Sequence, residues 1–345
     1  MGSTHTNMLL SIVIVSYNTK TFLSACLRSL ETHKASVEQE VIVIDNASTD
    51  GSVEMVLSDF PNCRLLQLKA NVGYGSAVNI AVLETKGQFL LLLNPDIEMR
   101  AGSLDLLIQM ASAHADAGVV SPRLVYANGE PQPSARRFLS PFWLLLESSR
   151  LHLCLPRRLR GRLLLGTYFP QDRTMEVPWV SGACHLIPRS VWERVGPLTE
   201  ETFCGSDDFD YCYRVSRLGY KVWLCSESTM IHHCSVAVRN RWNPWEVEQV
   251  ATHNFYVVLE EHWPQWRVKS YIAAEIVSCL TEIIRHRLLP RMRDDLASRQ
   301  YRDRLLLRLR MQLDLFWGRV RPQRRCQPIG SLSQTPISPT ATRRS

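Results

Sequence analysis

Four short apolar runs alternate with amphipathic stretches in the first 95 residues, and this alternation limits the possible folds more than any other feature. Short apolar runs are typical of strands buried on both faces, and the stretches between them have the apolar spacing of helices. Strands that alternate with helices pair mainly in parallel. The sequence therefore predicts a Rossmann-like α/β fold, with a mostly parallel central sheet and flanking helices. Strands are expected at residues 9–15, 41–44, 64–68 and 89–93, followed by a helix at 103–114 and a strand at 118–121.

Each of the first four strands ends in a cluster of polar residues. In doubly wound sheets, ligands bind beyond the carboxyl ends of the strands, so the clusters together predict a ligand site. No Gly-x-Gly-x-x-Gly pattern follows the first strand, which weighs against a dinucleotide-dependent dehydrogenase. The clusters are Ser16-Tyr17-Asn18, the segment 45–51, the segment 71–75, and Asn94-Pro95-Asp96.

The acidic residues in these clusters each have two interpretations. Asp45 can accept hydrogen bonds from a base or a ribose, whereas Asp50 either belongs to that site or only caps the next helix. Asp96 suits a Mg²⁺ or Mn²⁺ ion already bound to a diphosphate, because such ions take few protein ligands. The alternative for Asp96 is an Asx-Pro turn.

Two further groups of candidate residues occur later in the chain. Asp207, Asp208 and Asp210 enter a predicted helix at 207–218, and their mutual repulsion can raise a pKa and leave one carboxylate as a base. Acidic residues at a helix N-terminus can equally serve only to match the helix dipole. His232 and His233 follow a strand expected at 220–224, and neighbouring side chains point to opposite faces, so at most one faces the site.

The rest of the second half divides into an irregular and a helical part. Residues 126–171 are predicted to be loops around a short helix at Trp143, and 177–187 a strand. Helices are expected at 244–262, 266–289 and 296–317. Residues from 322 onward are rich in Pro, Ser and Thr, which is typical of disorder.

The basic character of the chain comes from its C-terminal helices. Residues 285–325 contain thirteen Arg and four Asp, against a net charge of +7 for the whole chain. A basic amphipathic helix indicates either a membrane-surface element or a helix packed on the protein with a solvated basic face. The sequence leaves both interpretations open. Nucleic acid is not an expected partner, because no nucleic-acid-binding fold or aromatic-basic pattern is present.

Cysteine usage and hydropathy indicate the compartment. The ten cysteines form no Cys-x-x-Cys pair and no zinc-type spacing, which fits a reducing compartment. Residues 1–8 lack the pattern of a signal peptide, and the apolar stretch 271–284 is too short to span a bilayer. We therefore expect a cytoplasmic protein, either soluble or peripheral on the inner face of the cell membrane.

Taken in order, the motifs resemble those of glycosyltransferase family 2, and within it the rhamnosyltransferase-like members that act on bacterial cell-surface polysaccharides. The resemblance covers roughly residues 9–262 and implies a fold of the GT-A type. It implies a catalytic domain at 1–240, with a nucleotide-binding half at 9–125 and an acceptor half at 126–240. A basic amphipathic helical extension at 241–321 and a disordered tail at 322–345 complete the expected organisation. The matching segments are 15–18, 43–52, 71–79, 92–96, 180–183, 207–214 and 231–233.

The resemblance implies an inverting hexosyl transfer from a dTDP- or UDP-linked sugar to a glycan or lipid-linked glycan, with Mg²⁺ or Mn²⁺ as cofactor. The general base is implied at Asp208, beside Asp207, and the metal ligands at Asp96 and His232, with His233 as the alternative. The implied nucleoside contacts are Ser16, Tyr17, Asn18 and Asp45, and the implied lining of the nucleotide-sugar pocket is Asp50, Gly73, Asn79 and Asn94. The implied substrate residues are Trp179, Gly182, Asp210 and Arg214, with the Trp179 ring stacking on the sugar and Gly182 leaving room for it.

The chain departs from the family pattern at a few positions. Asp207 stands in place of a usual Glu, Thr199 in place of a usual Asp, and Cys234-Ser235 in place of a usual glycine pair; the segment 203–206 lacks the usual aromatic residues. These departures concern acceptor specificity. The competing interpretations are a related enzyme with another donor, such as a UDP-linked hexose or galactofuranose, and a non-catalytic scaffold subunit that binds nucleotide sugars.

Overall fold

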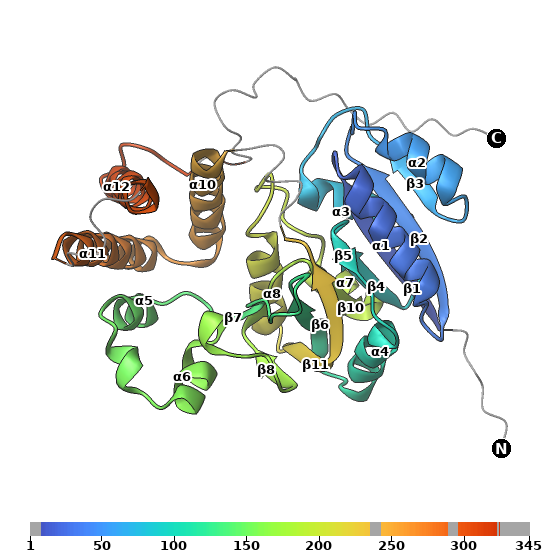
Figure 1. Ribbon diagram of the computed structural model, residues 1–345, viewed down its shortest axis with the longest axis horizontal. Helices are drawn as coiled ribbons and strands as arrows, with labels where there is room; N and C mark the ends of the chain where they lie inside the picture. The colour runs from blue at the N-terminus through green and yellow to red at the C-terminus, as the bar shows by residue number, and fades with distance from the viewer. Residues whose placement is uncertain (1–7, 235–242, 289–295, 323, 325–345) are drawn as a thin grey trace.

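The computed structural model describes residues 8–234, 243–288, 296–322 and 324. Helices alternate with strands from β1 to β4, and the described chain ends in the three helices α10, α11 and α12 (Figure 1). The strands are β1 (Leu9–Ser16), β2 (Glu38–Asp45), β3 (Arg64–Gln67), β4 (Phe89–Leu93), β5 (Ile97–Glu98), β6 (Ala117–Val125), β7 (Ala135–Arg136), β8 (Met175–Val177), β9 (Trp179–Val180), β10 (Cys184–Pro188) and β11 (Lys221–His232). The helices are α1 (Lys20–Thr32), α2 (Ser52–Asp59), α3 (Tyr74–Val82), α4 (Ser103–Ala113), α5 (Pro141–Ser148), η1 (Leu151–Cys154), α6 (Arg157–Leu164), η2 (Gly166–Tyr168), α7 (Arg189–Val195), α8 (Asp207–Arg217), α10 (Pro244–His262), α11 (Gln265–Leu288) and α12 (Leu296–Phe316).

The central sheet has the order β3-β2-β1-β4-β10-β6-β11-β5, with β8 paired to β11. Strands β1 to β4 run parallel, as do β6 and β11, while β10 is antiparallel to both β4 and β6. The predicted mostly parallel sheet is therefore confirmed. The carboxyl ends of β1, β2 and β4 carry three of the polar clusters, so the topology places them along one edge of the sheet.

Alternate residues of the apolar strands supply two separate core layers. On β4, Leu91 and Leu93 belong to the layer with α1, α2 and α4, whereas Leu90 and Leu92 belong to the layer with α3, α7 and α8. This follows from the two-residue period of a strand that is buried on both faces. Every residue of β4 is buried, which explains why its apolar run predicts the strand so well.

The predicted strand at 177–187 is wrong, because the structure divides it into three pieces. Pro178 separates β8 from β9, and proline has no N–H to donate to a sheet ladder. Strand β9 leaves the main sheet and pairs with β7. Before β10 begins, the backbone turns so that the Gly182 N–H donates to Asp208 instead of to a strand.

The C-terminal helices pack against α8. Figure 1 shows α10 to α12, together with α5 and α6, at the end of the molecule opposite α1 and α2. Tyr256 and Leu259 of α10 and Ile272 of α11 belong to the same buried cluster as α8. Helix α12 is fixed by a Tyr256–Gln312 hydrogen bond of 2.6 Å and by an Arg308–Glu275 ion pair of 2.8 Å.

None of the helices in the described part of the chain combines the length and apolarity that a bilayer crossing requires. The short helix expected at Trp143 is present as α5, whereas α6 has no counterpart in the sequence-based expectation of loops there. The disordered tail predicted at 322–345 lies outside the described residues, apart from Pro322 and Arg324.

Candidate active site

The cluster after β2 presents a buried carboxylate with one oxygen left over. Asp45 Oδ2 accepts a hydrogen bond of 2.9 Å from the Ser48 N–H. Asp45 Oδ1 is buried and finds no hydrogen-bond partner among the described residues. A buried carboxylate oxygen is costly to leave unpaired, so this position calls for a donor from outside the chain. The N–H of a nucleoside base is a donor of that kind.

The segment after β1 is locked against the segment after β2. The Asn18 N–H donates to Ser48 Oγ at 2.9 Å, and Asn18 Oδ1 accepts from the Thr49 N–H at 2.8 Å. Tyr17 is half-buried at this point. Ser16 is fully buried, and its hydroxyl faces Thr19 Oγ1 at 3.0 Å, so its side chain is turned into the protein. Asn18 and Ser16 therefore shape the backbone beside Asp45.

Asp50 holds the N-terminal ends of two helices. It accepts hydrogen bonds from the Lys20 N–H at 2.8 Å and from the Ser52 N–H and hydroxyl at 3.0 and 2.5 Å. Burial alone would raise the pKa of Asp50, but these hydrogen bonds outweigh it and lower the pKa. These contacts match the interpretation of Asp50 as a helix cap. Asp50 thereby holds together the segments that follow β1 and β2.

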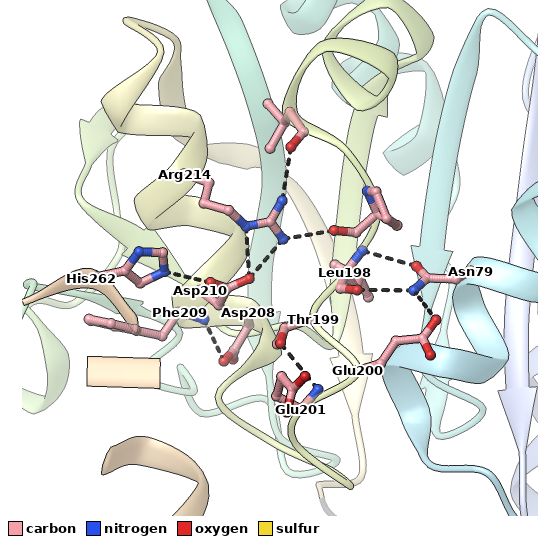
Figure 2. Close-up of polar contacts among 12 residues, drawn as sticks. Asn79, Leu198, Thr199, Glu200, Glu201, Asp208, Phe209, Asp210, Arg214 and His262 are labelled. Carbon is pink, nitrogen blue, oxygen red and sulfur yellow. Dashed lines mark hydrogen bonds and ion pairs between the residues drawn. The ribbon is translucent and has the colours of Figure 1, made fainter. Parts of the chain in front are cut away.

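Asn79 and Gly73 attach α3 to the loop before α8. The Asn79 amide bonds both the N–H and the carbonyl oxygen of Leu198 at 2.9 Å, and it reaches Glu200 Oε1 at 2.9 Å (Figure 2). Gly73 has a φ of 90°, and a Cβ atom there would lie 2.6 Å from the carbonyl oxygen of Phe203. Glycine is thus required by backbone conformation and by close approach. Both residues position the loop at 198–206.

Asp96 and His232 face each other in a buried position. β5 pairs with the end of β11, so Ile97 lies opposite His232 and Asp96 is its neighbour. Asp96 Oδ1 and His232 Nε2 are 3.4 Å apart, while His232 Nδ1 lies 2.5 Å from Gln132 Oε1. With that oxygen as acceptor, Nδ1 carries the proton and Nε2 presents a lone pair.

The same pair has the donor set of a divalent-metal site. Within the described residues His232 Nε2 has no hydrogen-bond partner, although it is buried and lies beside a carboxylate. Two facing electron-pair donors attract a cation, and a metal-binding histidine commonly donates its other N–H to an acceptor such as Gln132. Nearby, the Asn94 N–H donates to the Ala183 carbonyl oxygen at 2.9 Å. His232, Asp96 and Gln132 therefore fit a cation held on one carboxylate and one imidazole.

His233 points elsewhere. Its Nε2 lies 2.7 Å from Glu98 Oε1, and its ring packs on Phe22 with centroids 5.2 Å apart. The structure thus brings His232, and not the alternative His233, to Asp96.

Asp208 is held at the start of α8 by two backbone amides. Its Oδ2 accepts from the Gly182 N–H at 2.9 Å and its Oδ1 from the Phe209 N–H at 2.8 Å. The side chain is partly exposed, whereas Asp207 is buried. Burial, and then the Asp208 charge, raise the pKa of Asp207 to about 7. One carboxylate is therefore oriented and accessible, and its neighbour is costly to ionise.

Asp210 and Arg214 form a closed network with His262 of α10. Arg214 binds Asp210 Oδ2 at 2.7 Å and the carbonyl oxygens of Val195 and Pro197 at 3.0 and 2.8 Å (Figure 2). His262 Nε2 lies 2.7 Å from Asp210 Oδ1. Burial would raise the pKa of Asp210, but His262 and Arg214 outweigh it and lower the pKa. These two residues, expected at the substrate, are instead saturated by contacts within the protein.

Trp179 and Gly182 also differ from expectation. Trp179 is 8% exposed, its N–H donates to the Arg137 carbonyl oxygen at 2.7 Å, and its ring meets Phe209 edge to face. It belongs to the core and is not an open platform for a sugar. A Cβ atom at Gly182 would lie 3.1 Å from Asp208 Cβ, so the room left by the glycine is taken by Asp208.

Three residues that sequence reasoning missed complete the site. Gln132 orients His232, His262 braces Asp210, and Asn254 Nδ2 bonds the Cys204 carbonyl oxygen at 2.6 Å. None lies in a motif, and each acts across at least 50 positions of sequence. A second group that could hold a metal, Asp210 with Glu261 and His262, has ligand atoms within 4.8 Å, but Arg214 and His262 already bind Asp210.

The chain is similar to known glycosyltransferases in sequence and in fold. The family model for glycosyl transferase family 2 matches residues 11–194. The chain is 31% identical over 252 residues to an N-acetylglucosaminyl-diphospho-decaprenol L-rhamnosyltransferase of Mycobacterium tuberculosis, covering 65% of this chain and 76% of the relative. It is 24% identical over 228 residues to a low-salt glycan biosynthesis hexosyltransferase of Haloferax volcanii, covering 65% and 67%. The crystal structure of GalNAc-T7 with UDP, GalNAc and Mn²⁺ shares the fold, with a TM-score of 0.57, 17% identity, and coverage of 77% of this chain and 50% of that one.

Proposed function

The chain belongs to glycosyltransferase family 2, and from this premise we propose that it moves a hexose, rhamnose in the first instance, from a pyrimidine nucleoside diphosphate to a hydroxyl group of a glycan or lipid-linked glycan. The anomeric carbon inverts, because attack and departure occur on opposite faces of the sugar. The rhamnosyl donor is proposed from the relative that is 31% identical, which is named for rhamnose transfer. The lipid-linked acceptor is proposed from the same name.

The observation that carries the proposal is the contrast among the three carboxylates at the start of α8. Asp207 is buried with a raised pKa, and Asp210 is closed off by Arg214 and His262. Asp208 alone combines partial exposure with two backbone N–H groups that fix both of its oxygens. Asp208 therefore acts as the general base and takes the proton of the attacking hydroxyl.

The donor would bind along the strand ends. Asp45 Oδ1 would accept the base N–H, since that oxygen is buried and finds no partner in the described chain. Asp96 and His232 would hold a Mg²⁺ or Mn²⁺ ion on the diphosphate. Such an ion stabilises the negative charge that gathers on the departing nucleoside diphosphate. His232 is kept in the required tautomer by Gln132.

The proposed setting is the cytoplasm, with contact to the inner membrane face through the basic C-terminal helices. A lipid-linked acceptor gives that contact a purpose. The alternative of a non-catalytic scaffold is disfavoured by the Asp208 geometry, because a scaffold needs no exposed carboxylate fixed by two amides.

Two measurements test the proposal together. The first is the melting temperature of the purified protein with dTDP, UDP, GDP and their sugars, with and without Mn²⁺ or Mg²⁺, because a ligand that binds the native state raises it. The second is transfer by Asp208→Asn, which we expect to fall by about 10²- to 10⁴-fold while nucleotide stabilisation persists. Asp172→Asn, an exposed carboxylate outside the site, is the matched control. Normal turnover in Asp208→Asn would refute the base, and a flat nucleotide panel would favour the scaffold.

A further inference from the structure

Helix α5 is apolar, yet none of its apolar side chains is buried. Its sequence is Pro-Phe-Trp-Leu-Leu-Leu-Glu-Ser, and Ser148 is its one buried residue. Phe142 is 64% exposed and Leu145 38%. A helix that is apolar around most of its circumference is normally covered. The described part of the chain leaves this helix uncovered on its outer side.

The exposure continues through η1 and α6. The structure describes 17 exposed large hydrophobic side chains, and five of them fall between residues 142 and 159, so the apolar exposure is concentrated here. Four are scattered singly in or just after the sheet and its flanking helices, and the other eight are spread over residues 266–320. An apolar patch gathered in one place marks an interaction site. We define the α5–α6 surface by Phe142, Leu145, Leu151, Leu153 and Leu159, together with Arg150, Arg157, Arg158, Arg160 and Arg162.

This surface is strongly cationic as well as apolar. Residues 141–168 contain five Arg and a single acidic residue, Glu147. Partial desolvation raises the pKa of Glu147. Arg157, Arg158 and Arg162 are exposed. Apolar side chains interleaved with exposed arginines match the chemistry of an anionic lipid interface.

The α5–α6 surface is presented by an ordered unit. His152 Nδ1 lies 3.2 Å from the Leu146 carbonyl oxygen, and its Nε2 lies 2.7 Å from the Tyr168 hydroxyl. Arg285 of α11 donates to the Ser148 carbonyl oxygen at 2.5 Å, so α5 rests on α11 (Figure 1). In this half of α11, Leu280 and Ile284 are 43% and 56% exposed, which extends the apolar exposure beyond α5.

We propose that the α5–α6 surface docks on a bilayer that contains anionic lipids, with Phe142, Leu151 and Leu153 entering the interfacial region and the arginines at the headgroup phosphates. The inference deepens the proposed membrane contact and rests on the proposed function only for its purpose, which is access to a lipid-linked acceptor. A second copy of the chain is a poorer occupant. A two-fold interface would set the same five arginines against each other, with Glu147 as the single acidic residue of each copy's segment.

The test is flotation of the full-length protein with vesicles of phosphatidylcholine alone and of phosphatidylcholine mixed with phosphatidylglycerol. We expect binding to the mixed vesicles that weakens with added salt. A triple variant that carries Phe142→Ser, Leu151→Ser and Leu153→Ser should weaken binding by at least about tenfold, because the apolar insertion is lost. Arg157→Gln, Arg158→Gln and Arg162→Gln should each weaken it by about fivefold, and only with phosphatidylglycerol present.

Matched controls lie in or beside the helices that flank the central sheet. Leu57 and Leu83 are 63% and 85% exposed, and Arg100 and Arg217 are also exposed, so their Ser and Gln variants should bind vesicles normally. Equal binding to both vesicle types, undiminished binding by the α5–α6 variants, or equal loss in the controls would overturn the inference. So would binding of an acidic polypeptide by a protein that ignores vesicles. Nucleotide stabilisation and transfer to a soluble acceptor report on the proposed function separately, and they also show that each variant is folded.

Discussion

Two aspartate–histidine pairs lie in the described structure, and they differ in how far their side-chain atoms are hydrogen-bonded. Asp210 meets His262 at 2.7 Å, and Arg214 binds its other oxygen at 2.7 Å. Asp96 meets His232 at 3.4 Å, and His232 Nε2 has no hydrogen-bond partner within the described residues. The first pair is fully bonded within the protein, whereas the second leaves His232 Nε2 without a hydrogen bond among the described residues. Residue types alone do not distinguish a structural aspartate–histidine pair from one that can bind a ligand. The hydrogen bonds that each pair already makes within the protein do distinguish them.

The sharpest way to break this comparison is to remove Asp96. Asp96→Ala should lower transfer roughly a thousandfold, because the several kcal/mol of charge stabilisation supplied through this ligand is lost. Metal-dependent stabilisation by nucleotides should disappear with it. The measurement is kcat together with the melting temperature across a Mn²⁺ series. Glu98→Ala, which removes the partner of His233, is the control and should keep the metal dependence.

The matching change in the other pair should act on stability. Asp210→Asn should lower the free energy of unfolding by about 2–3 kcal/mol, because Arg214 and His262 lose a buried charged partner. The pKa of Asp210 is lowered in the folded state, so its stabilising effect is present at neutral pH and is lost as the pH falls through that pKa. Urea unfolding of wild type and variant should therefore converge in acid. A metal-dependent defect in this variant would contradict the distinction between the two pairs.

A subtler change tests how His232 is held. Gln132→Ala should raise the Mn²⁺ concentration for half-maximal nucleotide stabilisation by about 10- to 100-fold, because the histidine loses the acceptor that fixes its tautomer. Gln132→Glu keeps an acceptor at this position and should restore most of the affinity. If both variants bound Mn²⁺ like wild type, Gln132 would be a packing residue only.

The smallest expected effect concerns Asp207. Its folded pKa of about 7 lies above the ordinary value of 3.8, so the folded state holds this proton more tightly than the unfolded state. The associated destabilisation is absent below the ordinary pKa and is complete above pH 7. Asp207→Asn should therefore raise the melting temperature more at pH 8 than at pH 5. A pH-independent difference between the melting temperatures would show that Asp207 ionises normally.

Local sequence patterns predicted the sheet and most of its helices. The apolar run of β4 gave the bounds of that strand, and the acidic start of α8 was found at Asp207. These features depend on neighbours within one or two turns, where periodicity is informative. The strand predicted at 177–187 is divided by Pro178 and again by the turn at Gly182, whose N–H donates to Asp208, 26 positions away.

The site was only partly predictable for the same reason. Asp208 and His232 were predicted through the family motifs, and the structure places His232 beside Asp96 and Asp208 at the start of α8. The sequence assigned Arg214 to the substrate and Trp179 to the sugar. In the structure, Arg214 binds the Pro197 carbonyl oxygen, and the Trp179 ring packs against Phe209. Gln132 reaches His232 across 100 positions from a region without periodicity, so no local pattern could identify it.

The shared core of α8, α10 and α11 has a consequence for how the polypeptide is divided and recombined. Tyr256, Leu259 and Ile272 pack in the same buried apolar cluster as Phe209 and Val215 of α8. A fragment ending near residue 240 would expose this layer to water and leave Asp210 without His262. The two segments should therefore melt as a single cooperative unit, and a chimaera that exchanges residues 126–240 between relatives would have to carry its own α10 and α11. During synthesis, the apolar face of α8 can be covered only once those helices have left the ribosome.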